Sequence, residues 1–109
     1  MAAEPELLAG VRSVSLYALS PMKKTRNSAA RGIVTIPSGA EAHAGEIAMG
    51  AADFGKGRVF VSADTMAFQP FRIEQADNAA LLENIIGWLV RQPVSSERRE
   101  AFRNDLFVR

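Results

Sequence analysis

The sequence predicts a small α/β domain, a two-layer or three-layer sandwich with a short and partly parallel sheet. Two observations support this fold class. Two β-rich runs flank a glycine turn within residues 46–63, which is typical of a β-hairpin. A long hydrophobic run follows at residues 77–91 and a more polar one at residues 95–106, and both are predicted to be helices. Strands and helices in one short chain favour an α/β architecture.

Length and composition are those of one globular domain. The 109 residues fall in the usual size range of a single domain, which we expect to span residues 1–109, with residues 1–10 as a candidate disordered segment. Hydrophobic residues make up 48% of the chain and charged residues 23%, as in ordinary globular proteins. The net charge of +1 argues against electrostatic attraction to nucleic acid or to a membrane surface.

The residues that are absent exclude several kinds of chemistry. The chain contains no cysteine, which removes disulfides, thiolate nucleophiles and cysteine-ligated zinc. With one histidine, the sequence predicts no metal site and no cofactor. The first residues lack the features of a signal peptide, and the longest apolar run, residues 85–90, is far too short to span a bilayer. We therefore expect a cytoplasmic protein with no membrane partner.

Four segments have the pattern of β-strands. Val14 and Leu16 alternate with serines, which predicts a strand with one buried face. Residues 32–37 are rich in β-formers and end at a proline. Residues 46–52 and 58–63 form the two arms of the hairpin, and both glycines of the turn are expected to adopt positive φ. The consecutive residues Val59, Phe60 and Val61 predict a strand that is covered on both faces.

The helix predicted at residues 77–91 is the clearest element. Asp77 or Asn78 is expected to cap its first turn, and Pro93 prevents its continuation. Its apolar residues leave only a narrow polar stripe at Glu83, Gly87 and Arg91, so most of its circumference is expected to be buried. A last helix follows, with a serine at its start and a glutamate in its first turn.

Two runs of the sequence resemble segments of a known protein family. They are residues 52–64 (ADFGKGRVFVSAD) and residues 77–89 (DNAALLENIIGWL). They are similar to the closing segment of class I glutamine amidotransferase-like domains, especially the trehalose-utilisation (ThuA-like) relatives. The resemblance covers about forty residues. It implies a flavodoxin-like α/β fold, of which this chain has about half the usual length.

The resemblance also shows what the chain lacks. Catalytic members use a cysteine nucleophile and a histidine base at the end of a strand, whereas this chain has no cysteine and carries Asp64 and Thr65 at the corresponding strand end. Glutaminase chemistry is therefore excluded. A half-length sheet would leave unpaired edges and uncovered apolar faces, and self-association is one way to cover them. We therefore expect a homodimer or another protein partner.

Candidate ligand-binding residues lie near the end of the last strand. Asp64 and Thr65 occupy a position where α/β folds often bind ligands, and Arg72 follows on the adjoining loop. His43, on another loop, is a candidate general base because its pKa lies near neutrality. The alternatives are that Asp64 hydrogen-bonds nearby amides to hold the turn, and that His43 is a solvated loop residue.

Apolar side chains of the last loop and of the predicted helix are candidate interface residues. They are Leu82, Ile86, Trp88, Phe68 and Phe71. The alternative is that Phe68 and Phe71 cover the end of the sheet as part of the core. The basic residues Lys23, Lys24, Arg26 and Arg31 are candidates for phosphate contacts, but they lack interleaved aromatic residues, so a solvated loop is favoured over nucleic-acid binding.

The function favoured by these observations is that of a non-catalytic, amidotransferase-like α/β domain that acts through protein association. The alternative is a small-ligand or carbohydrate-related enzyme with a site near Asp64, His43 and the loop at residues 66–75. The basic cluster offers a third and weaker hypothesis, a nucleic-acid accessory protein. We expect no enzyme activity, while a small-molecule ligand remains compatible with the sequence.

Overall fold

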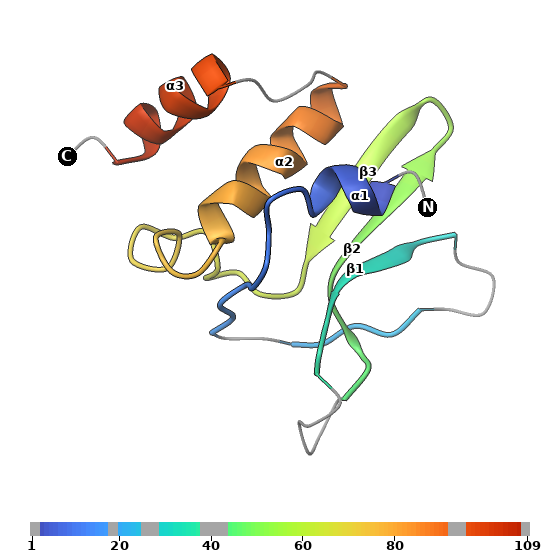
Figure 1. Ribbon diagram of the computed structural model, residues 1–109. Helices are drawn as coiled ribbons and strands as arrows, with labels where there is room; N and C mark the ends of the chain where they lie inside the picture. Colours follow the sequence, from blue (N-terminus) through green and yellow to red (C-terminus); the bar gives the residue numbers. More distant parts are fainter. Residues whose placement is uncertain (1–2, 18–19, 25–28, 38–43, 92–95, 108–109) are drawn as a thin grey trace. The chain divides into compact units, whose positions relative to one another are not determined.

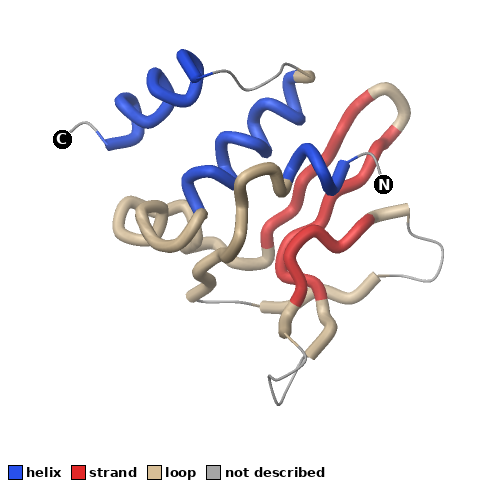
Figure 2. The backbone as a smooth tube through the Cα atoms, in the orientation of Figure 1, coloured by secondary structure: helices blue, strands red, loops and turns tan. Residues whose placement is uncertain are grey.

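The computed structural model describes residues 3–17, 20–24, 29–37, 44–91 and 96–107. The chain divides into two compact units. The helical unit consists of Met1–Ser15 and Ala67–Arg109, and the sheet unit consists of Leu16–Met66. The helical unit is therefore discontinuous in the sequence, because the sheet unit is inserted between its two segments. Figure 1 labels the helices and strands, and Figure 2 distinguishes them from loops.

The sheet unit contains one antiparallel sheet. Its strands are β1 (Arg31–Thr35), β2 (Ile47–Phe54) and β3 (Gly57–Ser62), in the order β1-β2-β3. Both strand pairs are antiparallel, so the prediction of a partly parallel sheet is wrong. The connection between Thr35 and Ile47 falls short of the dozen or more residues that a parallel crossover requires, and the turn between β2 and β3 is shorter still.

The hairpin predicted within residues 46–63 is confirmed as the pair β2–β3. Phe54 pairs with Gly57, so the turn between the strands contains only Gly55 and Lys56. Gly55 has a φ of +60°, whereas Gly57 has no positive φ, so only one of the two glycines meets the expectation. A positive φ at the first central position alone is the pattern of a type II′ turn, which matches the twist of a hairpin.

Strand β1 occupies most of the segment predicted as a strand at residues 32–37. Its register with β2 shifts on both sides of Val34, which indicates bulges that bend the pair. Gly32 lies opposite Gly50, and a Cβ atom at Gly32 would come within 3.2 Å of Ile47 Cγ1. A glycine therefore allows the two strands to approach at this bend.

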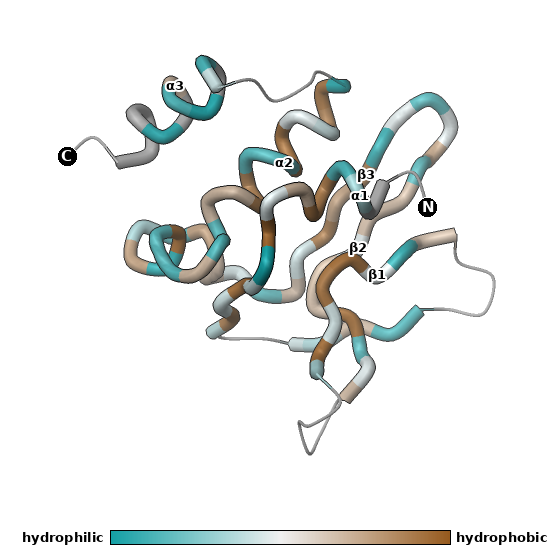
Figure 3. Tube along the Cα trace, in the orientation of Figure 1, coloured by the Kyte–Doolittle hydropathy of each residue, from teal (hydrophilic) through white to brown (hydrophobic). Residues whose placement is uncertain are grey.

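The helical unit contains three helices. They are α1 (Ala3–Leu7), α2 (Asn78–Val90) and α3 (Ser96–Phe107). Both predicted C-terminal helices are thus confirmed, and a short helix lies in the N-terminal segment that the sequence marks as a candidate for disorder. The side chain of Leu7 in this helix is fully buried. In sequence, α2 is largely hydrophobic and α3 largely hydrophilic, a contrast that Figure 3 shows along the tube.

The start of α2 differs from the prediction, whereas the helix ends before Pro93 as predicted. Asp77 occupies the N-cap position, but neither it nor Asn78 forms a side-chain capping hydrogen bond. At the other end, Arg91 adopts a left-handed conformation with a φ of 59°, and its N–H is directed at the carbonyl groups of Gly87 and Trp88. The predicted polar stripe is wrong at two of its three residues, because Glu83 and Gly87 are both buried.

The strand predicted around Val14 and Leu16 is also wrong. Residues 11–17 form no strand, although the alternation of apolar and polar residues is real. The N–H groups of Ser13 and Ser15 bond instead to the side chains of Asp77 and Asn78. A period of two indicates an extended chain with one buried face, but it does not identify what satisfies the backbone.

Candidate functional site

Asp64, the leading candidate ligand residue, is buried just beyond β3. Its Oδ1 atom accepts the N–H of Met66 at 2.8 Å, and its Oδ2 atom accepts the N–H of Tyr17. Its backbone carbonyl accepts a hydrogen bond from the Ser62 hydroxyl at 2.9 Å. Only 2% of Asp64 is exposed, so its carboxylate fixes the loop after β3 and joins it to the chain at Tyr17. This geometry matches the structural alternative for Asp64.

The other candidate ligand residues do not add a site around Asp64. Thr65 is exposed in the sheet unit, and Arg72 is half-buried in the helical unit. The carbonyl oxygen of Arg72 accepts hydrogen bonds from the Gln75 N–H and the Asn78 amide. His43 lies outside the described residues.

Two neighbouring polar residues at the start of α2 hold the N-terminal segment. The Oδ2 atom of Asp77 accepts the N–H groups of Arg12 at 2.7 Å and Ser13 at 3.1 Å. The Oδ1 atom of Asn78 accepts the Ser15 N–H at 2.8 Å. The Asn78 amide donates to the carbonyl of Ser15 at 2.9 Å, and to two more carbonyls on the loop before α2. The side chains of Asp77 and Asn78 thus form the hydrogen bonds with the backbone of residues 12–15 that a neighbouring strand would form in a sheet.

The hydrogen bonds to Asp77 make its contribution to stability dependent on pH. The Arg12 N–H, and then the Ser13 N–H, hold the pKa of Asp77 below its ordinary value. Because the folded pKa is depressed, the stabilisation is present above the unfolded pKa of about 4 and is lost as the pH falls through the folded value.

We therefore expect Asp77→Asn to be less stable than the wild type at pH 7, with the difference shrinking toward pH 3. Urea denaturation of both proteins across this range measures the effect. The asparagine side chain keeps a neutral acceptor, so it isolates the charge. An equal difference at both pH values would contradict the assignment.

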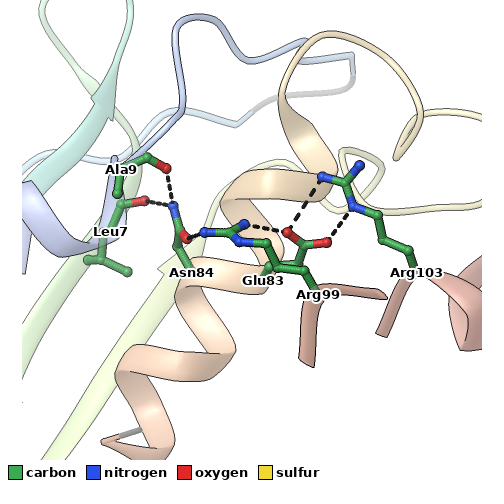
Figure 4. A network of polar contacts seen from close by, with 6 residues as sticks. All are labelled: Leu7, Ala9, Glu83, Asn84, Arg99 and Arg103. Carbon is green, nitrogen blue, oxygen red and sulfur yellow. Dashed lines mark hydrogen bonds and ion pairs between the residues drawn. The ribbon is translucent and has the colours of Figure 1, made fainter. Parts of the chain in front are cut away.

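A second polar network joins α2 to α1 and α3 (Figure 4). The amide of Asn84 donates to the carbonyls of Leu7 at 2.9 Å and Ala9 at 2.8 Å. The buried carboxylate of Glu83 binds two guanidinium groups from α3, with Arg99 Nη1 at Oε1 and Arg103 Nε at Oε2, both at 2.5 Å. The polar residues of α2 thus hold together elements that are distant in the sequence.

A cavity of about 610 Å³ lies beside the N-terminal end of α2 in the helical unit. Its lining comprises Ile73, Glu74, Ala76, Asp77, Ala79, Ala80 and Arg103. Two of its charged groups are already engaged, since Asp77 binds backbone amides and Arg103 binds Glu83. The lining contains no hydroxyl or thiol that could act as a nucleophile, so the chemistry of an acyl-transfer site is missing here.

The candidate interface residues of the helical unit differ widely in exposure. Trp88 is 2% exposed, whereas Phe71 is 89% exposed. Leu82, Ile86 and Phe68 are half-buried. The part of α2 that is exposed and apolar lies at its last turn, where Leu89 and Val90 are 40% and 50% exposed.

Strand β3 presents an exposed apolar surface that the sequence analysis missed. Burial alternates along the strand, with Val59 at 45% and Val61 at 46% exposure. Phe54, beside the turn, is 80% exposed. The prediction that both faces of this strand are covered is therefore wrong. The alternation of Arg58, Phe60 and Ser62 with the two valines could have indicated that the valines share one exposed face.

The basic residues near β1 are partly neutralised. Lys23 lies 3.4 Å from the Glu46 carboxylate, and Arg31 lies 3.6 Å from that of Asp53. Lys24 is exposed, and Arg26 lies outside the described residues. The described part of the cluster is thus no continuous phosphate-binding surface.

Comparisons of the chain with protein families, with curated proteins and with solved structures find no match. Within the described ranges, no three metal-ligating side chains of histidine, cysteine, aspartate or glutamate come together. None of the described helices has the length and hydrophobicity needed to cross a bilayer.

Proposed function

We propose that this protein is a non-catalytic domain that acts through protein association and forms a homodimer. The observation that carries the proposal is the exposed apolar surface of the sheet unit, formed by Phe54, Val59 and Val61. Single exposed apolar residues are common, but these three share one hairpin, and two of them lie on one face of one strand. Exposed apolar side chains on a strand at the edge of a sheet favour association with another protein.

The polar residues of the chain support the same proposal. The carboxylates of Asp64, Asp77 and Glu83 all bind backbone amides or arginines of the chain itself. A catalytic carboxylate has to contact its substrate, and Asp64 and Glu83 are poorly placed to do so because both are buried with both oxygens occupied. The enzyme alternative with a site at Asp64 is therefore less well supported.

The proposal includes an amidotransferase-like origin for residues 52–64 and 77–89. Asn78 and Asn84, which lie within the second of these segments, bind backbone groups. A related segment would keep such residues for folding even without the catalytic pair.

The proposal is tested by replacing both valines with lysine, as Val59→Lys with Val61→Lys. The wild type is expected to sediment as a dimer over a range of concentrations, and the variant as a monomer, because two charges replace the apolar contact surface. Analytical ultracentrifugation measures the change. Leu89→Lys with Val90→Lys is the matched control, since these apolar residues have similar exposure on α2.

The control variant is expected to remain dimeric. A wild type that stays monomeric up to about 1 mM, where even weak contacts are populated, would overturn the proposed function. A dimer that survives the lysines in β3 but not those in α2 would overturn the assignment of the surface.

A further inference from the structure

The outer edge of β3 is open to pairing within the described part of the chain. The sheet order β1-β2-β3 places β3 at one edge, and its described strand partner is β2 alone. An edge strand exposes a row of backbone N–H and C=O groups that can pair with another strand. The residues that present these groups follow from the register.

The register with β2 fixes which backbone groups of β3 point outward. The Ala63 N–H donates to the Ala48 carbonyl at 2.8 Å, just beyond the strand end, and the same register pairs Gly50 with Val61. Backbone direction alternates along an antiparallel strand, so Val59 and Val61 direct their N–H and C=O groups at β2. Phe60 and Ser62 direct theirs away from the sheet.

We infer that a second copy of this chain binds edge to edge through β3, in an antiparallel ladder centred on Phe60. The ladder places Phe60 opposite Phe60 of the second copy, and Val59 opposite Val61. Two three-stranded sheets then become one continuous sheet across a two-fold axis. This inference rests on the proposed function and adds how the two copies bind.

The side chains of β3 are complementary to themselves in this register. The valines of both copies form one apolar patch on one face of the joined sheet, and the two phenylalanines form an aromatic pair on the other. Arg58 falls opposite Ser62 of the second copy, so like charges do not meet.

The register itself follows from the backbone. Moving one strand by a single residue would set the outward groups of one copy against the inward groups of the other. Moving it by four residues would set Arg58 opposite Arg58. The ladder centred on Phe60 is the one in which all the outward residues of both strands, Arg58, Phe60 and Ser62, fall opposite one another.

The absence of cysteine from the chain allows a direct test by disulfide trapping. Val59→Cys and Val61→Cys chains are prepared separately, mixed in equal amounts and oxidised mildly. Opposite residues in a non-hydrogen-bonded pair have Cα atoms about 4.5 Å apart, within the range of a disulfide. Residue 59 and its own copy lie on a diagonal of about 7–8 Å, which exceeds that range.

We therefore expect the mixture to form a covalent dimer and each variant alone to remain largely uncrosslinked. Thr65→Cys, an exposed position in the same unit, measures cross-linking by random collision. Rapid cross-linking of either variant alone, or equal cross-linking of all samples, would overturn the register. Melting curves of both cysteine variants establish that they fold.

A second measurement does not depend on substitution. In the ladder, the Phe60 and Ser62 amides become protected from hydrogen exchange as the protein concentration rises. If the two copies instead pack through their valine faces without pairing their edges, these amides will keep exchanging at high protein concentration. That result would overturn the edge-to-edge inference but not the proposed function. A wild type that stays monomeric would overturn both.

Discussion

Replacing Asn78 by alanine is expected to lower the free energy of unfolding by about 3 kcal/mol. The side chain is fully buried and takes part in four hydrogen bonds to backbone groups. Alanine would leave a small cavity, the buried Ala67 carbonyl without its Asn78 donor and the half-buried Ser15 N–H without its Asn78 acceptor. Urea denaturation followed by the fluorescence of Trp88, the single tryptophan, measures the loss in the helical unit.

Asn78→Asp separates hydrogen bonding from shape. A carboxylate of the same size would face the carbonyls of Ser15, Ala67 and Arg72, to which the amide now donates. At pH 7 we expect this variant to be less stable than the alanine variant. Burial raises the pKa of such a carboxyl group, so the gap should narrow as the pH falls and the protonated group regains a donor.

Gln69→Ala is a suitable control for both variants, because this exposed residue uses only its backbone in the described contacts. Its effect should stay within about 0.5 kcal/mol. An Asn78→Ala variant as stable as this control would show that the amide network contributes nothing net. An Asn78→Asp variant equal to Asn78→Ala at every pH would contradict the donor role.

Removing both arginines that bind Glu83 is expected to be the other large effect, at about 3–5 kcal/mol. The side chain of Glu83 is 1% exposed, so Arg99→Met with Arg103→Met would leave a buried carboxylate without a counter-charge. Detachment of α3 would relieve the penalty by exposing the carboxylate. Hydrogen exchange in Ser96–Phe107 detects that detachment, and urea denaturation measures the energy.

Replacing Glu83 and keeping both arginines should lower the stability less than replacing the arginines. The arginine side chains are 34% and 46% exposed, so after Glu83→Met they can regain water. Adding Glu83→Met to the arginine pair should recover much of the lost stability, because no charge then remains buried. A Glu83→Met variant as damaged as the arginine pair, or a triple variant without recovery, would contradict this account.

Elements with local signals were predictable from the sequence. The turn at Gly55 and the β-formers on either side predicted the hairpin, and the apolar run of α2 predicted a helix. Both depend on residues that are close in the chain. The sheet direction was mispredicted because the resemblance suggested a parallel fold, although the short connection between Thr35 and Ile47 favoured antiparallel pairing.

The polar contacts could not be predicted, because they depend on distant residues. The residue type and position of Asp77 predict a helix cap, yet its carboxylate binds the N–H groups of Arg12 and Ser13. The sequence around Glu83 predicts an exposed polar residue, yet its carboxylate is buried and is neutralised by two arginines from α3. A residue's type shows that it needs partners, whereas the tertiary fold decides which partners it receives.

The discontinuous helical unit sets an order of events during synthesis. The Ala9 carbonyl meets the Asn84 amide across a separation of 75 residues, which a ribosome adding 5–20 residues per second covers in roughly 4–15 s. The inserted hairpin needs only neighbouring residues and can form on the nascent chain meanwhile. Throughout that interval Leu7, fully buried in the finished fold, has no native partner on α2, so the N-terminal segment cannot take up its final packing until α2 has been made.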